Sequence, residues 1–179
     1  MRNQQKTYLM MTAVAGIATA VVALATPGSG VLSSPVLARA NFQDSVDIKF
    51  KIEQASKHGS KHGDKHGNKE VIRVSDTQET VLQQIVFSPG GQTGWHSHPG
   101  PVIVLVKAGA LTFYSGDDPE CVGRTYTAGQ SFIDSGQGHV HIARNESASA
   151  DLELWAMYFD VPPGGAFRID APAPGNCSF

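Results

Sequence analysis

Two short segments of this chain contain the histidines best placed to bind a metal ion. They are GGQTGWHSH, residues 90–98, and GHVHIARN, residues 138–145. Side chains two residues apart in a strand point to the same face, about 7 Å apart, so His96 and His98 can converge on one ion. A neighbouring strand would bring His141 to the same point. Three neutral imidazoles around one open face suit a divalent transition metal: Fe, Mn, Cu, Ni or Zn.

These residues resemble the two sequence motifs of the cupin family. The positions in register with the first motif are Gly90, His96, His98 and Gly109, and those in register with the second are Gly138, His141 and Asn145. The resemblance extends over residues 70–160 and implies a jelly-roll barrel that holds a metal through His96, His98 and His141. The chain also looks like small, exported, single-domain bacterial cupins that have no assigned reaction.

The chain differs from the cupin motif at the position of the usual glutamate ligand, which is Val102 here. The resemblance therefore implies an all-imidazole centre, with a higher net charge and one more position open to water or substrate. Such a centre is a stronger Lewis acid. No acidic residue lies within four positions of Val102, so a replacement carboxylate must come from another segment. Asp134 is the nearest candidate in the second motif.

The third histidine ligand has two candidates, His139 and His141, which would lie on the same face of one strand. Counting back from Asn145 along the cupin motif selects His141, whereas counting forward from Gly129 falls between the two histidines. Gly136 stands where the family usually has proline, so the motif is least regular just before this pair. We assign His141 as the ligand and keep His139 as an alternative.

Three classes of function fit these residues. The first is a metal-dependent enzyme of oxygenase type that acts on a small chelating substrate. The second is a metal-containing protein that binds a small molecule without turnover, and the third is a purely structural barrel. The sequence identifies no catalytic residue beyond the candidate ligands, and no nucleophile lies beside a base, so acyl-transfer chemistry has no support. A fold alone cannot choose among these classes.

Strand signals dominate the chain after its first forty residues. Short segments rich in β-branched and aromatic residues alternate with turns, at 46–52, 80–87, 102–107, 111–114, 130–133, 140–144 and 152–159. No segment of helical periodicity follows residue 40. This spacing predicts an all-β jelly-roll barrel in a single domain. Because cupins often pair through their outer strands, the resemblance also implies a homodimer.

The first forty residues are typical of an export signal. Arg2 and Lys6 precede an uncharged run, residues 8–25, and small-residue cleavage patterns end at Ala25 and Ala40. We take the second pattern as the boundary, which places the protein in the periplasm or outside the cell. An uncleaved anchor on the outer face of the membrane is the alternative. The rest then divides into an N-terminal strand and linker (41–70), the barrel (71–160) and a tail rich in Pro and Gly, packed on the barrel (161–179).

Charge and cysteine content agree with an exported protein that does not bind nucleic acid. The chain has a net charge of −2, and −5 without its first forty residues, which contain three basic residues and no acidic one. Such a surface does not attract a phosphate backbone. In an oxidising compartment the only two cysteines, Cys121 and Cys177, would form a disulfide that ties the tail to a loop. Two independent thiols are the alternative.

One segment is of low complexity: KHGSKHGDKHGN, residues 57–68, which contains three Lys-His-Gly repeats. A glycine in each repeat disfavours a helix by about 1 kcal/mol per position, so we interpret the segment as a linker. Loose binding of Zn, Cu or Ni by its histidines and a response to pH are alternative roles. The neighbouring lysines repel cations, which weakens the metal-binding alternative.

Overall fold

Every regular element is a β-strand within residues 24–53 and 69–179, the part of the chain that a computed structural model describes. In chain order the strands are β1 (Ser29–Ser33), β2 (Val36–Asn41), β3 (Ile48–Glu53), β4 (Lys69–Val74), β5 (Glu79–Gln92), β6 (His96–Ser97), β7 (Val102–Ala108), β8 (Ala110–Ser115), β9 (Arg124–Thr127), β10 (Ser131–Asp134), β11 (His141–Arg144), β12 (Leu152–Val161) and β13 (Ile169–Asp170). These described residues contain no helix long and apolar enough to cross a membrane.

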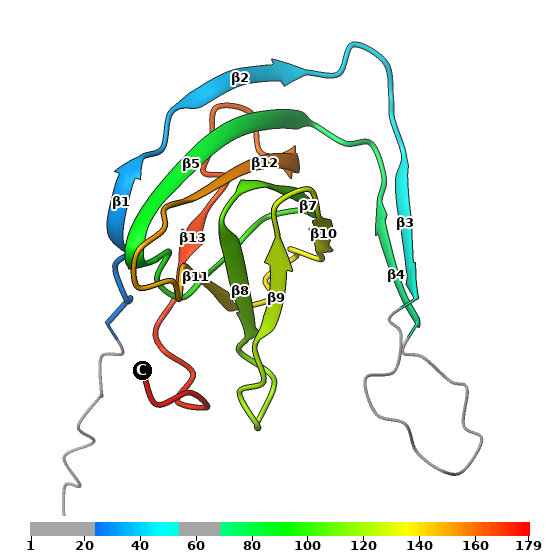
Figure 1. The fold of residues 1–179 in the computed structure, drawn as a ribbon. Helices are drawn as coiled ribbons and strands as arrows, with labels where there is room; N and C mark the ends of the chain where they lie inside the picture. The colour runs from blue at the N-terminus through cyan, green and yellow to red at the C-terminus, as the bar shows by residue number, and fades with distance from the viewer. Residues whose placement is uncertain (1–23, 54–68) are drawn as a thin grey trace, which may run out of the picture.

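The longest strand, β5, organises the barrel. One edge of β5 pairs with β12, and the other edge pairs with β1 and β2. The sheet continues from β12 to β7 and β10, while the end of β5 reaches β11, which also pairs with β6 and β8. β9 lies beside β8, and β13 beside β6. All pairings are antiparallel, and the sheet curls into a nearly closed barrel (Figure 1). The predicted all-β jelly-roll class is confirmed.

Alternating side chains fill the barrel interior. In β7, Val102, Val104 and Val106 point inward and are buried, whereas Leu105 between them is exposed. The inward residues of β5, β8, β11 and β12 join them in one hydrophobic cluster that includes Phe87. A polar side chain at an inward position therefore lies among apolar neighbours and needs a polar partner.

β1 and all of β2 except Asn41 lie within the first forty residues, which the sequence assigns to the export signal. β2 pairs with β5 along its length, and the Arg39 guanidinium forms an ion pair with the buried carboxylate of Glu79. The division at residue 40 therefore cuts through β2, and cleavage there would remove two strands from the barrel. Residues 1–23, with most of the apolar run, lie outside the described residues, so the cleavage itself stays a prediction.

β3 and β4 form a separate hairpin beside the barrel (Figure 1), which it contacts through the rings of Phe50 and Phe159, whose centroids lie 6.1 Å apart. The segment that connects them contains the Lys-His-Gly repeats, which lie outside the described residues. The predicted strand 46–52 corresponds to β3, and β6 carries His96 as expected, whereas β4 and β9 fall in segments that the sequence does not single out. β9 has four residues and little apolar content, whereas β4 follows directly on the Lys-His-Gly repeats and overlaps the end of the predicted linker.

The C-terminal tail, residues 161–179, is attached to the barrel at several points. Phe167 packs against the hydrophobic cluster, and β13 pairs with β6. Cys177 forms a disulfide with Cys121, with 5.3 Å between their Cα atoms, which is the pairing expected from the sequence. Beside this bridge, the Asn176 side-chain amide donates hydrogen bonds to two carbonyl groups of the same loop. The tail therefore forms part of the wall at one end of the barrel.

Candidate metal centre

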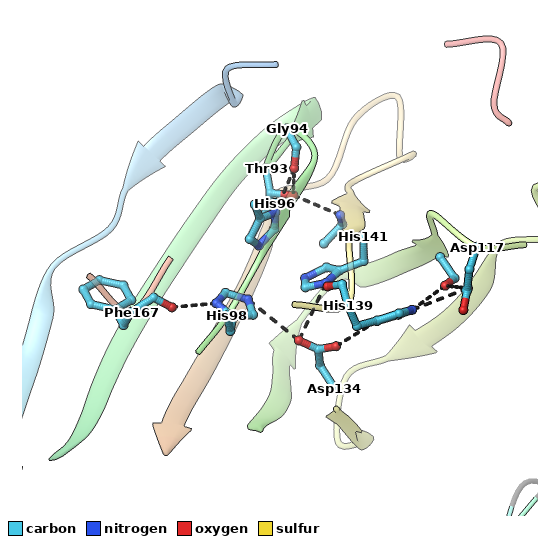
Figure 2. Close-up of polar contacts among 11 residues, drawn as sticks. Thr93, Gly94, His96, His98, Asp117, Asp134, His139, His141 and Phe167 are labelled. Carbon is cyan, nitrogen blue, oxygen red and sulfur yellow. Dashed lines mark hydrogen bonds and ion pairs between the residues drawn. The ribbon is translucent and has the colours of Figure 1, made fainter. Parts of the chain in front are cut away.

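The paired strands β6 and β11 bring three histidines together inside the barrel. His141, the first residue of β11, is the direct partner of His96 in β6, and His98 follows two residues later. The ring centroids lie 4.3 Å apart for His96 and His141, 4.8 Å for His96 and His98, and 5.2 Å for His98 and His141. One ligand atom of each ring lies within 4.8 Å of the others. All three side chains are buried and face one another (Figure 2).

Backbone carbonyl groups orient the three rings. Nδ1 of His96 lies 2.8 Å from the Gly94 carbonyl oxygen, and Nδ1 of His98 lies 2.7 Å from the Phe167 carbonyl oxygen. Nδ1 of His141 lies 3.3 Å from the carbonyl oxygen two residues before it. Because a carbonyl oxygen only accepts hydrogen bonds, Nδ1 carries the proton in each ring and Nε2 keeps its lone pair. Outer partners of this kind fix the tautomer of metal-binding histidines.

Burial keeps these imidazoles neutral. Desolvation is the largest cause that holds the pKa of His96 well below its usual value, lowers the pKa of His98 to about 4, and lowers the pKa of His141. The positive charge of Arg168 acts in the same direction on all three. A metal binds only the neutral imidazole, because a protonated ring has no lone pair to donate. The cluster is therefore ready to bind a metal at neutral pH.

The histidines lie between a small cavity and an open cleft. The cavity, about 40 Å³, is inside the barrel and has mainly apolar walls, with room for about three water molecules. The cleft, about 580 Å³, is lined by residues of the N-terminal segment, the barrel and the tail, including Phe167 and Arg168. His96 and His98 line both spaces. A small molecule in the cleft would therefore lie beside His96 and His98.

Asp134 is the acidic residue that lines the cavity. It ends β10, pairs directly with Val102 in β7, and is 3% exposed. Its Oδ2 lies 3.8 Å from Nε2 of His98 and 3.7 Å from Nδ1 of His141, and it has no hydrogen-bond partner. Burial by itself raises the pKa of Asp134, but His141, His139 and His98 together lower it below its usual value. Asp134 is therefore a carboxylate that faces the histidines.

His139 is not part of the three-histidine cluster. Two residues with positive φ values, 51° and 85°, precede it, so the chain is not extended there and strand alternation does not apply. Its Nε2 lies 2.6 Å from Ser115 Oγ, and the ring is directed away from the cluster toward Asp117 (Figure 2). Its Nδ1 lies 3.4 Å from Asp134 Oδ1. The geometry therefore selects His141 over His139 as the third member of the cluster.

Two motif positions prove to be structural. Asn145 is 1% exposed, and its side-chain amide donates to the carbonyls of Ser88 at 3.0 Å and Ala150 at 2.9 Å, which ties the end of β11 to its neighbours. Gly136 has a φ of 60°, and a Cβ atom there would lie 1.8 Å from the Gly100 carbonyl oxygen. Proline is restricted to a φ near −65°. The proline that the cupin motif usually has at this position is therefore incompatible with the backbone conformation here.

Sequence reasoning missed two contributions from the tail. Phe167 offers its backbone carbonyl to His98, and Arg168 lies at the edge of the cleft. The Arg168 guanidinium is held by hydrogen bonds to the Thr93 carbonyl at 2.6 Å and to Asp170 at 2.7 Å. A contact through a backbone carbonyl depends on the path of the chain and leaves no trace in residue type. For Arg168, the composition of the tail suggested a covering role and gave this residue no part in the site.

Solved structures similar to this chain are cupin-domain proteins. A cupin domain from Bordetella pertussis is 27% identical over 45% of this chain and 80% of that one, with a TM-score of 0.38. A cupin-like protein from Thermotoga maritima is 27% identical over 44% and 55%, with a TM-score of 0.38. An oxalate oxidase is 22% identical over 45% and 41%, with a TM-score of 0.39. This chain thus spans about half the length of the latter two proteins. No family model and no curated protein matches it.

Proposed function

We propose that this protein binds a divalent transition metal through Nε2 of His96, His98 and His141 and presents it to a small chelating molecule. One observation carries the proposal: three buried histidines converge while each directs its Nδ1 to a backbone carbonyl. Nε2 of the three rings has no hydrogen-bond partner among the described residues, so its lone pair is available to a cation. Fe, Mn, Cu, Ni and Zn all accept imidazole ligands. A bound metal would act as a Lewis acid toward the molecule that fills its open positions.

The cleft beside the histidines supports a small anionic chelator as the ligand. Its volume of about 580 Å³ is in the range of small-molecule sites. Its walls combine apolar side chains with Arg168, whose guanidinium is held in place by Thr93 and Asp170. A metal ion and a guanidinium in one cleft favour a ligand with paired anionic oxygens over a neutral or cationic one.

Metal analysis of the purified protein tests this proposal. The protein is expressed without an affinity His tag, and the histidines of the Lys-His-Gly repeats are replaced by glutamine, so that loose binding there does not contribute. We expect one ion per chain in this parent protein and none after His98→Ala. His139→Gln is the matched control and should keep the ion. A parent protein that takes up none of Fe, Mn, Cu, Ni or Zn would leave only the structural barrel.

Turnover is tested separately on the metal-loaded protein. Dicarboxylates, α-hydroxy acids and catechols present the paired oxygens that the cleft favours, and each is supplied in air-saturated buffer. Oxygen uptake with product formation that disappears after His96→Ala would identify an oxygenase-type enzyme. Binding of the same compounds without product would identify a binding protein. If none of them binds to the loaded protein, the chelating ligand proposed here is wrong.

We also propose that the protein is exported and that any cleavage follows Ala25 rather than Ala40. Cleavage after Ala40 would remove β1, β2 and Arg39, and it would leave the buried Glu79 without its ion-pair partner. From Thr26 onward the chain is tied to the barrel, since the Thr26 hydroxyl accepts a hydrogen bond from a barrel amide at 2.8 Å. Sequencing the N-terminus of the protein released by its cells tests this. A chain that begins at residue 41 would overturn the proposal.

A further inference from the structure

We infer that Asp134 is the carboxylate ligand of this metal centre, in place of the residue at position 102. The inference rests on the proposed function, because it concerns the same ion, and it adds a fourth protein ligand to the three histidines. Asp134 and Val102 are direct partners in the antiparallel ladder of β10 and β7, and both line the cavity. Directly paired side chains lie on the same face of a sheet. The acidic residue therefore lies on the strand next to the one that carries position 102, directly opposite that position in the ladder.

The first argument is the unsatisfied oxygen of Asp134. Oδ2 is buried and has no hydrogen-bond partner, and a buried carboxylate oxygen in that state is unfavourable. The nearest imidazole nitrogens, on His98 and His141, lie at 3.8 Å and 3.7 Å, too far for hydrogen bonds. Nδ1 of His141 is also directed to the carbonyl of His139. A cation bound to Nε2 of His98 would give Oδ2 its missing partner.

The second argument is the distance between the atoms that would share the ion. With metal–nitrogen and metal–oxygen bonds of about 2.1 Å, two ligand atoms of one ion lie between about 3.0 Å, at a right angle, and about 4.2 Å, in line. The separation of Asp134 Oδ2 and His98 Nε2, 3.8 Å, falls within these limits. Asp134 Oδ2 and His98 Nε2 are therefore spaced so that one ion can bind both atoms.

The third argument is charge. Apart from the histidines, Asp134 and Tyr158, the cavity is lined mainly by apolar side chains. Three neutral imidazoles would leave the full double charge of the ion in these surroundings. One carboxylate reduces that charge by half, which favours binding of the ion in a medium of low polarity. The centre then differs from the all-imidazole set that Val102 alone implies.

An alternative position for the ion shares part of this set. Asp134, His139 and His141 also offer one ligand atom each within 4.8 Å. However, Nε2 of His139 is engaged with Ser115 Oγ at 2.6 Å, and its ring is directed toward Asp117 (Figure 2). The two positions make different predictions, because only the alternative requires His139. We therefore include a His139 variant in the test.

Titration with Co²⁺ tests the role of Asp134, with the affinity measured by chelator competition and the coordination by the visible d–d spectrum. The protein carries glutamine in place of the repeat histidines. Asp134→Asn and Asp134→Ala should weaken Co²⁺ binding by about a hundredfold or more, the upper end for loss of a supporting group, and should change the spectrum. Asp117→Asn is the matched control, because it removes a carboxylate that contacts His139 on the outer side. It should leave both readouts unchanged.

A second variant restores the carboxylate from the neighbouring strand. Val102→Glu combined with Asp134→Ala should recover Co²⁺ affinity to within about tenfold of the parent, since the two positions are paired. This double variant and Asp134→Asn keep the test valid if Asp134→Ala does not fold, which circular dichroism will show. Recovery supports a ligand role, because a merely structural carboxylate would not be replaced from another strand.

The outcomes separate this inference from the proposed function. A parent protein that binds neither Co²⁺ nor any of Fe, Mn, Cu, Ni and Zn contradicts both. A parent that binds Co²⁺ while Asp134→Asn and Asp134→Ala keep its affinity and spectrum overturns the role of Asp134 and leaves the three-histidine site standing. If the Asp134 variants bind Co²⁺ more weakly but keep the parent spectrum, Asp134 supports the ligands without binding the ion. If His139→Gln weakens Co²⁺ binding as much as the Asp134 variants do, the ion lies at the alternative position. Each of these two results also overturns the inference.

Discussion

His141 and His139 are separated by one residue, yet they occupy opposite environments. His141 is buried inside the barrel beside two other imidazoles, and desolvation is the largest cause of its lowered pKa. His139 lies in an outer cleft of about 520 Å³ with Ser115 and Asp117. The hydrogen bond to Asp134 is the largest cause that raises the pKa of His139. The inner histidine therefore favours the neutral, metal-binding form, and the outer histidine favours the protonated form.

Asp134 lies between these two regions and lines both the cavity and the outer cleft. Its Oδ2 faces the inner histidines, and its Oδ1 faces His139 (Figure 2). The comparison shows that burial and hydrogen-bond partners, rather than spacing in the sequence, decide the chemistry of each imidazole. Substitutions among the inner histidines and substitutions in the outer cleft should therefore differ in their effects on metal affinity and on stability.

The largest difference between the regions should appear in metal affinity. His141→Ala removes a ligand, so we expect the affinity for Zn²⁺ to fall on the order of a thousandfold, more than the 10–100-fold typical of an outer partner. His139→Ala should change it by less than about tenfold. Isothermal titration calorimetry, in protein lacking the repeat histidines, measures both. Similar losses in the two variants would mean that inner and outer histidines are not distinct in function.

The disulfide belongs to the outer region and should affect stability without affecting the metal. The Cys121–Cys177 bridge joins residues 56 apart, so its replacement by two serines should lower the free energy of unfolding by up to about 4 kcal/mol. Urea denaturation measures this loss. Because the bridge contributes nothing to the histidine cluster, the folded variant should keep its Zn²⁺ affinity. A strong loss of affinity in the folded variant would show that the two regions are coupled.

The metal-free protein should lose stability in acid because of the inner histidines. The pKa of His98 is about 4 in the folded protein and 6.5 as its reference value. The unfolded chain then binds the proton more readily, so stability is full above pH 6.5 and falls as the pH decreases toward 4. His98 alone accounts for up to about 3 kcal/mol. Urea denaturation between pH 7.5 and 4.5 should show a shallower decline in His98→Gln, and an unchanged slope would contradict burial as the cause.

The smallest effect should come from His139, and it should have the opposite sign. Its pKa is raised in the folded protein, so its contribution to stability is full below pH 6.5 and is lost as the pH rises through the folded value. Because the side chain is partly exposed, we expect about 1 kcal/mol or less. His139→Gln should therefore destabilise the metal-free protein at pH 6 but not at pH 8.5. A loss that is equal at both pH values would indicate a packing role instead.

Much of the fold could be predicted from the sequence because its signals are local. Alternation of apolar residues identifies β5, β7 and β12, and the glycines near Lys107 and Thr127 mark the turns between strands. β1 and β2 could not be predicted, because their small and apolar residues have the composition of an export signal. Their strand character comes from the ladder with β5 and from the ion pair of Arg39 with Glu79. A pattern within a few residues cannot reveal such a partner.

The sequence by itself determined the strand-forming segments and the placement of His96 and His98 on one side of the chain, because both follow from side-chain alternation over a few residues. Only the tertiary structure decided that His141 rather than His139 completes the cluster, that Asp134 stands beside Val102, and that the tail orients His98. These contacts depend on strand register and on a left-handed turn before His139. They join segments far apart in the chain, so the identities of the residues do not specify them.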